Sequence, residues 1–164
     1  MKSVADFSFD WVPDNPLSAE DNQQIMHLWT ERAGLKVTEA NRRQQELVLI
    51  TRERSGKIVG LATVYKARLE QIHNWVYFYR CFIDPDFRAP ALDTQMLYKT
   101  KMKLEAKSQA DTESKCVGVA IIIQNEMIKH LWNQAVWPGT EMIFIGCTAE
   151  GNHIRIGYFK NAVI

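Results

Sequence analysis

The stretch of sequence that decides the fold covers residues 81–97 and reads CFIDPDFRAPALDTQML. Its first residues, Cys81 to Ile83, are typical of a buried strand, which Pro85 ends in a sharp turn. A short loop then opens directly into a helix that carries the apolar pair Met96 and Leu97. Such a loop exposes free backbone N–H groups at the positive end of a helix, which suits a phosphate. The sequence therefore predicts a strand, a phosphate-binding loop and a helix in direct succession.

Ahead of this stretch, residues 74–83 form the longest predicted strand, which is central because it is apolar on both faces. Further strands are predicted at residues 7–12, 46–53 and 58–66. Between the first two of these, a helix begins after the N-cap Ser18 and ends at Gly34. Residues 35–45 are polar and are compatible with a loop or with a second short helix.

After the stretch, the helix that begins at Asp93 is predicted to run to about Ser108. A short helix is predicted over residues 127–135, with three residues on its inner side: Ile128, Leu131 and Trp132. Strands are predicted at residues 116–123, 142–148 and 153–160. The order of elements predicts a mixed α/β fold with an antiparallel first part and helical crossovers later, in a single domain over residues 1–164.

Composition excludes several classes of protein. Lys and Arg number 20 against 19 Asp and Glu, so a broad electrostatic attraction to nucleic acid or to an anionic membrane is not expected. The N-terminus has no continuous apolar core and no apolar run approaches the length of a membrane helix, which indicates a cytoplasmic protein. The three cysteines and four histidines lack the spacing of metal ligands, so no metal site is expected.

The order of strand, Pro, Arg, loop and helix resembles the cofactor-binding segment of the GNAT superfamily of N-acetyltransferases. In that superfamily a central strand ends in apolar-x-apolar-x-Pro, and an Arg or Gln then opens the motif Arg/Gln-x-x-Gly-x-Gly/Ala. Cys81, Ile83 and Pro85 match the strand end, and Arg88 matches the opening residue. Ala91 stands at the first glycine, and Asp93 stands at the last Gly or Ala.

The resemblance implies a mixed, mostly antiparallel central sheet that is flanked by helices, with strands splayed at a cofactor cleft. It implies that the main chain around the loop wraps the pyrophosphate of acetyl-CoA, at Arg88, Ala89, Ala91, Leu92, Asp93 and Thr94. It also implies that main-chain groups at Cys81 and Ile83 meet the thioester and the pantetheine arm.

Asp93 is the departure with the largest physical consequence. A carboxylate in the first helical turn is favourable for the helix itself, but it repels a phosphate that competes for the same N–H groups. Pro90 also removes one N–H donor from the loop. Asp93 is therefore open to two interpretations, a poor fit in a cofactor loop or the cap of a helix that binds nothing.

A second local match follows the strand at residues 116–123. Members of the superfamily often show Asn-x-x-apolar-x-x-apolar-Tyr there, and Asn125, Ile128 and Leu131 fit this pattern. The resemblance makes Asn125 a hydrogen-bond partner of the cofactor, and a plain helix cap is the alternative. Trp132 replaces the tyrosine that commonly serves as general acid, and is either a cofactor contact or a core residue.

The candidate catalytic residues are Tyr77 and Cys81. Tyr77 stands where the superfamily often has an acidic residue, and with an unperturbed pKa of about 10 it is a poor base at neutral pH. Cys81 lies on the same side of the strand, where its main chain, rather than its thiol as a nucleophile, is the expected contribution.

The resemblance implies an N-acyltransferase that moves an acetyl group from acetyl-CoA to an amine of a small molecule or protein by direct attack. The alternative is a GNAT-fold protein that has lost catalysis and acts as a binding or regulatory module. The strand pair at residues 142–160 could support a homodimer. Neither a nucleic acid nor a membrane is an expected partner.

Overall fold

The computed structural model describes residues 3–111 and 113–164. These residues fall into two compact units, each built from two separate segments of chain. The first unit combines Met1–Val64 with Arg80–Thr100, and the second combines Tyr65–Tyr79 with Lys101–Ile164. The single domain expected from chain length stays a prediction.

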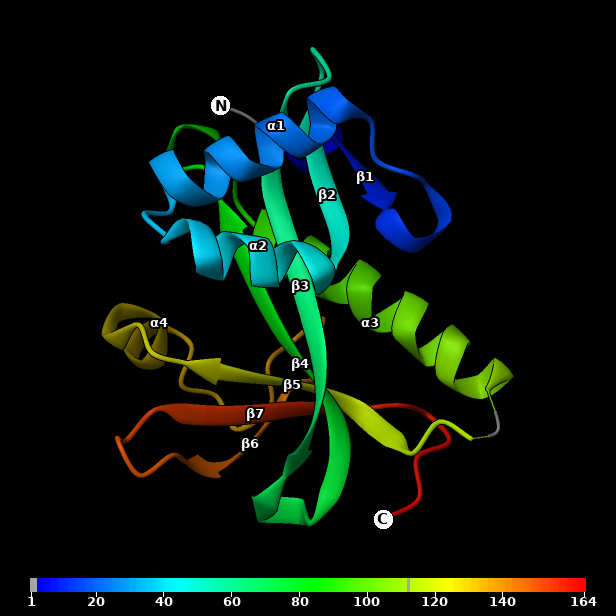
Figure 1. Ribbon diagram of the computed structural model, residues 1–164. Helices are drawn as coiled ribbons and strands as arrows, with labels where there is room; N and C mark the ends of the chain where they lie inside the picture. The colour runs from blue at the N-terminus through cyan, green and yellow to red at the C-terminus, as the bar shows by residue number, and fades with distance from the viewer. Residues whose placement is uncertain (1–2, 112) are drawn as a thin grey trace. The chain divides into compact units, whose positions relative to one another are not determined.

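The strands form a seven-stranded sheet in the order β1-β2-β3-β4-β5-β7-β6, shown in Figure 1. Antiparallel pairs join β1 with β2, β2 with β3, β5 with β7 and β6 with β7, whereas β4 and β5 run parallel. Helices flank this sheet. The predicted fold class, a mixed and mostly antiparallel sheet with flanking helices, is therefore confirmed.

The first segment of the first unit, up to Val64, contains the N-terminal strands and helices. Its elements are β1 (Phe7–Trp11), α1 (Ala19–His27), a π-helical extension η3 (Leu28–Arg32), α2 (Val37–Gln45), β2 (Leu47–Glu53) and the start of β3 (Ile58–Leu69). Ser18 caps α1 as expected, since its Oγ accepts the N–H of Asp21 at 3.0 Å. The polar residues 35–45, for which a loop and a helix were both open, contain α2.

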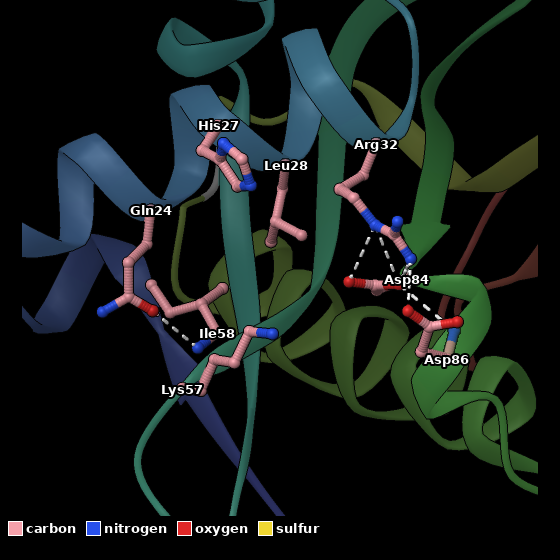
Figure 2. Close-up of a pocket in the computed structure, with 8 residues that line it drawn as sticks. All are labelled: Gln24, His27, Leu28, Arg32, Lys57, Ile58, Asp84 and Asp86. Atoms are coloured by element: carbon pink, nitrogen blue, oxygen red, sulfur yellow. Dashed lines mark hydrogen bonds and ion pairs between the residues drawn. The ribbon is translucent and has the colours of Figure 1, made fainter.

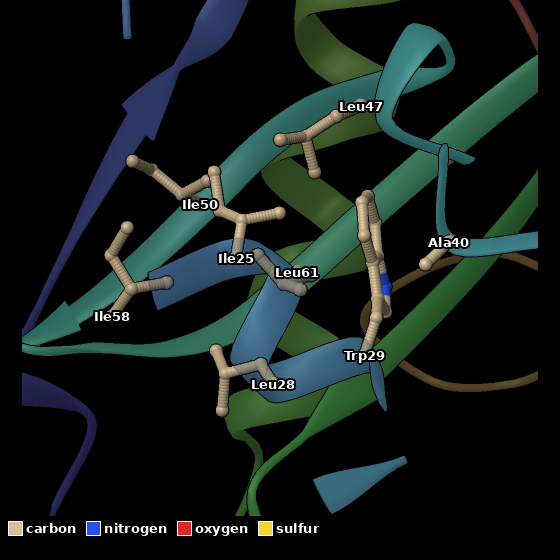
Figure 3. Close-up of a cluster of buried hydrophobic side chains, with 8 residues drawn as sticks. All are labelled: Ile25, Leu28, Trp29, Ala40, Leu47, Ile50, Ile58 and Leu61. Carbon is tan, nitrogen blue, oxygen red and sulfur yellow. The ribbon is translucent and has the colours of Figure 1, made fainter. Parts of the chain in front are cut away.

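One face of α1 and η3 packs against β2 and β3 of the first unit (Figure 3). The buried cluster consists of Ile25, Leu28, Trp29, Ala40, Leu47, Ile50, Ile58 and Leu61. Removal of this much apolar surface from water is the main force that fixes α1 and η3 on the sheet. Arg32, the last residue of η3, is thereby held at a fixed place in the unit.

The first unit also contains the end of β4 (Asn74–Ile83), a short 3-10 turn η5 (Pro85–Phe87) and the start of α3 (Leu92–Ala110). Leu92 is fully buried in a small cluster with Phe7 and Val59. The chain between β4 and α3 is therefore anchored at its far end by a core residue.

The second unit contains the rest of β3 and β4 with β5 (Cys116–Ile123), α4 (Glu126–Leu131), β6 (Ile143–Cys147) and β7 (His153–Tyr158). Its core consists of Leu69, Val76, Phe78, Val117, Ala120, Ile154 and Ile156. Strands β5 and β7 lie unusually close at Gly118, where an added Cβ would lie 2.4 Å from the carbonyl oxygen of Gly157. Glycine at this position is thus required by the close approach of the two strands.

Strand β6 is an edge strand of the sheet, but a neighbouring segment covers part of its outer edge. The N–H of Phe144 donates to the carbonyl of Ala135 at 2.8 Å, and the N–H of Trp137 donates to the carbonyl of Met142 at 2.9 Å. Val136 and Ile143 form the corresponding antiparallel bridge.

Helix α4 differs from its prediction in length and in orientation. It ends at Leu131, and Leu131 and Trp132 are 61% and 44% exposed rather than turned inward. Lys129 is the buried residue of this helix, where its ammonium pairs with Glu126 at 2.6 Å. The inward prediction for Ile128, Leu131 and Trp132 was wrong because a lysine with a paired charge occupies the inner side.

Among the residues that the structure describes, no helix combines the length and apolar character that a bilayer crossing requires. The same residues contain no group of three or more His, Cys, Asp or Glu side chains placed to hold a metal ion.

Candidate cofactor site

The loop from β4 to α3 is the predicted phosphate-binding segment, and it lies wholly within the first unit. Strand β4 ends at Ile83, and the N–H of the next residue, Asp84, donates to the carbonyl of Val59 on β3 at 2.8 Å. Pro85 has no N–H to continue the ladder, so the chain turns into η5. The side chain of Asp84 caps this turn by accepting the N–H of Asp86 at 3.1 Å.

The direction of the β4 amides follows from the same hydrogen bond. Successive main-chain N–H groups of a strand point to opposite edges. Because the N–H of Asp84 donates to Val59 on β3, this alternation places the N–H groups of Ile83 and Cys81 on the side away from β3. Cys81 is exposed and Ile83 is half-buried. These are the two residues whose main-chain groups were predicted to meet the cofactor.

Ala91 adopts the backbone conformation that the glycine of the motif would supply. Its φ is 61°, in the left-handed region that glycine favours. The strain of placing an alanine there is about 1 kcal/mol. The turn is closed by the N–H of Leu92, which donates to the carbonyl of Ala89 at 3.2 Å, and by the N–H of Gln95, which donates to Ala91 at 2.9 Å. The tight turn at the start of α3 therefore persists although the glycine is absent.

The carboxylate of Asp93 already accepts a hydrogen bond from one amide of the loop. Its Oδ1 accepts the N–H of Thr94 at 2.7 Å, in the first turn of α3. An exposed carboxylate therefore lies at the helix end where a phosphate would compete for the same N–H. Within the described part of the chain, the N–H groups of Ala89, Ala91 and Asp93 donate no hydrogen bond to protein. Pro90, which has no N–H, lies between the first two of these donors.

Arg32 contacts the start of the loop, as Figure 2 shows. Its Nη2 lies 2.7 Å from Oδ1 of Asp84 and 2.6 Å from Oδ2 of Asp86, and its Nε lies 3.2 Å from both carboxylate oxygens of Asp84. The side chain of Asp84 is only 3% exposed. The hydrogen bonds from Arg32 hold the pKa of the Asp84 carboxyl below its usual range, against the opposing effect of burial.

A cavity of about 250 Å³ lies beside this ion pair in the first unit (Figure 2). It is lined by Gln24, His27, Leu28, Arg32, Lys57, Ile58, Asp84 and Asp86. The Lys57 ammonium lies 4.7 Å from the ring centre of Phe87 and also lowers the pKa of Asp84 through its charge. Gln24 is held by the N–H of Ile58, which donates to its Oε1 at 2.9 Å.

The structure divides the predicted site residues between the two units. The first unit brings together Cys81, Ile83, Arg88, Ala89, Ala91, Leu92, Asp93 and Thr94. Arg88 is exposed and forms no ion pair with another described residue. Leu92 contributes its side chain to the core, so that only its main chain belongs to the loop surface.

Tyr77, Asn125 and Trp132 belong to the second unit. The side chain of Asn125 caps α4, since its Oδ1 accepts the N–H groups of Met127 at 2.9 Å and of Ile128 at 3.2 Å. The carbonyl of Trp132 accepts hydrogen bonds from Nη2 of Arg155 at 3.1 Å and from Nε1 of Trp137 at 2.8 Å.

Tyr77 is buried, with the ammonium of Lys66 located 5.4 Å from its ring centre. It pairs with Val119 in the parallel ladder between β4 and β5, and Phe78 opposite Ala120 is the last pair of that ladder. Tyr77 is thus a packed side chain with a cation–π contact, and its catalytic role stays a prediction.

Sequence reasoning missed the contact between Arg32 and the loop. Arg32 lies 52 residues before Asp84, and nothing in the local pattern of either segment links the two. The pair Asp84-Pro85 was visible as a turn signal, but burial of the Asp84 carboxylate was not.

Neither a family model nor a curated protein matches the sequence. Solved structures do match the fold, and the fold is that of the GNAT acetyltransferases. An acetyltransferase of the GNAT family from Streptococcus pneumoniae has a TM-score of 0.55 at 10% identity, over 92% of this chain and 96% of its own.

Two further solved structures of similar fold hold a ligand. AtaT complexed with acetyl-methionyl-tRNAfMet has a TM-score of 0.60 at 13% identity, over 94% of this chain and 96% of its own. AtaTR bound with AcCoA has a TM-score of 0.60 at 13% identity, over 95% of each chain. At these identities the likeness shows the fold. One of these structures contains a tRNA. The expectation that this chain has no nucleic-acid partner is therefore unsupported.

Proposed function

We propose that this chain is an N-acyltransferase that transfers an acetyl group from acetyl-CoA to an amine of a small molecule or protein. The observation that carries the proposal is the φ of 61° at Ala91, which lies immediately before α3 and three residues after Arg88. An alanine adopts this strained conformation at the position where the family motif has glycine, which supports a loop built for close approach of a ligand. The fold shared with structures that bind AcCoA also supports it.

The backbone of the loop offers donors that suit a diphosphate, and the side chain of Asp93 is the one group that is unfavourable for it. The N–H groups of Ala89, Ala91 and Asp93 are the proposed donors, and Arg88 is the proposed charge partner. Asp93 opposes binding, because its carboxylate already accepts the N–H of Thr94. We therefore expect weaker cofactor binding than a loop with glycine or alanine at this position would give.

The chemistry of transfer follows from attack of a neutral amine on the thioester carbonyl. The amine nitrogen forms the new C–N bond, the C–S bond breaks, the thiolate leaves, and the amine loses one proton. Main-chain N–H groups at Cys81 and Ile83 are the proposed donors to the oxyanion and to the pantetheine arm. Trp132 has an indole N–H that cannot protonate the leaving thiolate, so the proton must come from water or another group.

The competing proposal is a GNAT-fold binding or regulatory module without catalysis. It is favoured by the hydrogen bond from Thr94 to Asp93 and by the use of Asn125 to cap its own helix. In that case the same fold would present a surface to a partner.

The two proposals separate on cofactor binding. Unfolding temperature is measured with and without CoA and acetyl-CoA, since a ligand at 100 times its Kd adds about 2.7 kcal/mol of stability. A clear rise with both ligands supports the transferase, and turnover is then screened against amino acids, polyamines, aminoglycosides and a methionyl-tRNA. No rise at millimolar ligand contradicts the transferase and favours the module.

A further inference from the structure

We infer that Arg32 is a positioning residue for the loop between β4 and α3, which it holds in its binding conformation through Asp84 and Asp86. The inference rests on the proposed function, because it assigns a role in the same cofactor site. The ion pairs of Arg32 with Asp84 and Asp86 form a loop clamp.

The geometry of the loop clamp is specific to a guanidinium. Nε and Nη2 of Arg32 both donate to the carboxylate of Asp84, while Nη2 also lies 2.6 Å from Asp86 (Figure 2). A planar fork with several fixed donors can bind both carboxylates at once, whereas a lysine ammonium acts as a point charge. The two aspartates lie on either side of Pro85, so the contact fixes the turn itself.

Two fixed ends leave little freedom for the segment between them. At the near end, Asp84 is held by Arg32 and by its main-chain bond to Val59. At the far end, Leu92 is fully buried in the core. Residues 85–91 therefore span two anchors, and Ala91, with its strained φ of 61°, lies directly beside the far one. Loss of Arg32 removes the side-chain part of the near anchor and leaves only the main-chain bond to Val59, which allows the loop to relax and the amides of Ala89 and Ala91 to turn away.

Burial of Asp84 makes the loop clamp a strong constraint. A carboxylate that is 3% exposed is unfavourable without a partner, because it is removed from water. If Arg32 is lost, Asp84 gains hydration only by moving toward solvent, and the adjacent turn moves with it. The nearby charge of Lys57 reduces this effect in part.

The side chain of Arg32 belongs to the wall of a cavity and not to the core. It is 36% exposed and lines the cavity of about 250 Å³. Replacement of Arg32 therefore removes little packing from the cluster under α1, so its main effect falls on the loop. This separates a positioning role from general stabilisation of the unit.

The test compares Arg32→Met and Arg32→Lys with Arg42→Met, a control that removes surface ion pairs to Glu39 and Glu46 on the same unit. Amide hydrogen exchange is followed without ligand over β2 and at the loop amides that are hydrogen-bonded within the chain, those of Phe87, Leu92 and Gln95. We expect exchange in the loop to rise at least tenfold in Arg32→Met, less in Arg32→Lys and not in Arg42→Met, with β2 unchanged in all three. Unchanged exchange in the loop of Arg32→Met overturns the clamp.

Affinity is then measured by calorimetry for CoA and for pantetheine, which lacks the diphosphate. We expect Arg32→Met to weaken CoA at least tenfold and pantetheine less than twofold. If the affinity of Arg32→Met falls equally for both ligands, or falls for neither, the positioning role is overturned. This holds even if hydrogen exchange in the loop has risen. Absence of CoA binding by the unaltered protein contradicts the proposed function instead, and the exchange experiment still decides whether Arg32 holds the loop.

Discussion

The carboxylate of Asp93 accepts the main-chain N–H of Thr94 at 2.7 Å, at the point where the loop between β4 and α3 becomes helix. The helix end is thus neutralised from within the chain. This contact stabilises α3 and competes with an incoming phosphate for the same donor.

Replacement of Asp93 by glycine should strengthen CoA binding by about tenfold, which is about 1.4 kcal/mol. A negative charge leaves the loop and the N–H of Thr94 becomes available. Without ligand the same change should lower the free energy of unfolding by about 1 kcal/mol, because a cap and a favourable charge are lost. Calorimetric titration and urea unfolding measure the two effects.

Asp93→Asn is the matched control, since it removes the charge and keeps a side-chain acceptor. It should give an intermediate gain in CoA affinity. Affinity that is unchanged or weaker in Asp93→Gly would count against the placement of the diphosphate at this loop.

Replacement of Ala91 by glycine should stabilise the protein. The φ of 61° strains an alanine by about 1 kcal/mol, and glycine removes most of this strain although it adds freedom to the unfolded chain. The expected net gain is about 0.5 kcal/mol in urea unfolding. Ala89→Gly, at a position without positive φ, should instead destabilise by a similar amount, and an equal loss in both variants contradicts the strain.

The loop clamp should make stability depend on pH in the acid range. Arg32 lowers the pKa of Asp84 below the usual 3.8, so the folded protein binds fewer protons there than the unfolded chain. The stabilisation is fully present above about pH 4 and is lost as pH falls through the lowered pKa.

Comparison with Asp84→Asn measures this contribution by urea unfolding at pH 7, 5 and 3. We expect the natural chain to be more stable by about 2 kcal/mol at pH 7, since hydrogen bonds to charged groups contribute about 1.5–3 kcal/mol and exposure of Arg32 reduces this. The difference should shrink at the lowest pH. A difference that grows on acidification would contradict the sign of the pKa shift.

Asn125 can be tested as a helix cap and as a cofactor partner at once. Asn125→Ala should lower stability by about 1 kcal/mol, because the N–H groups of Met127 and Ile128 lose their acceptor. Asn125→Asp keeps the acceptor and should retain stability. If Asn125 also donates to the cofactor, Asn125→Asp should weaken CoA binding, whereas unchanged affinity identifies Asn125 as a cap alone.

The sequence was sufficient to predict most elements and the fold class, because apolar periodicity and turn residues report local structure. It indicated the strand, turn and helix around Pro85, and these are local features. The prediction of the buried side of α4 was wrong. In this six-residue helix the buried residue is Lys129, whose charge is paired with Glu126, and apolar periodicity does not identify such a residue.

The contact between Arg32 and Asp84 could not be predicted, because it depends on how a helix and a strand end pack across 52 residues of chain. The positive φ of Ala91 was also out of reach, since alanine rarely adopts it without anchors on both sides. Which donors of the loop remain available likewise depends on one side-chain rotamer of Asp93.

The segment at Ala135–Trp137 has a consequence for self-association. A second molecule that extended the sheet beside β6 would have to displace the bonds that Phe144 and Trp137 already make within their own chain. Along this part of the β6 edge, backbone hydrogen bonding between two copies is therefore blocked. Pairing of two copies along this covered part of β6 would therefore have to use side-chain surfaces instead of backbone hydrogen bonds.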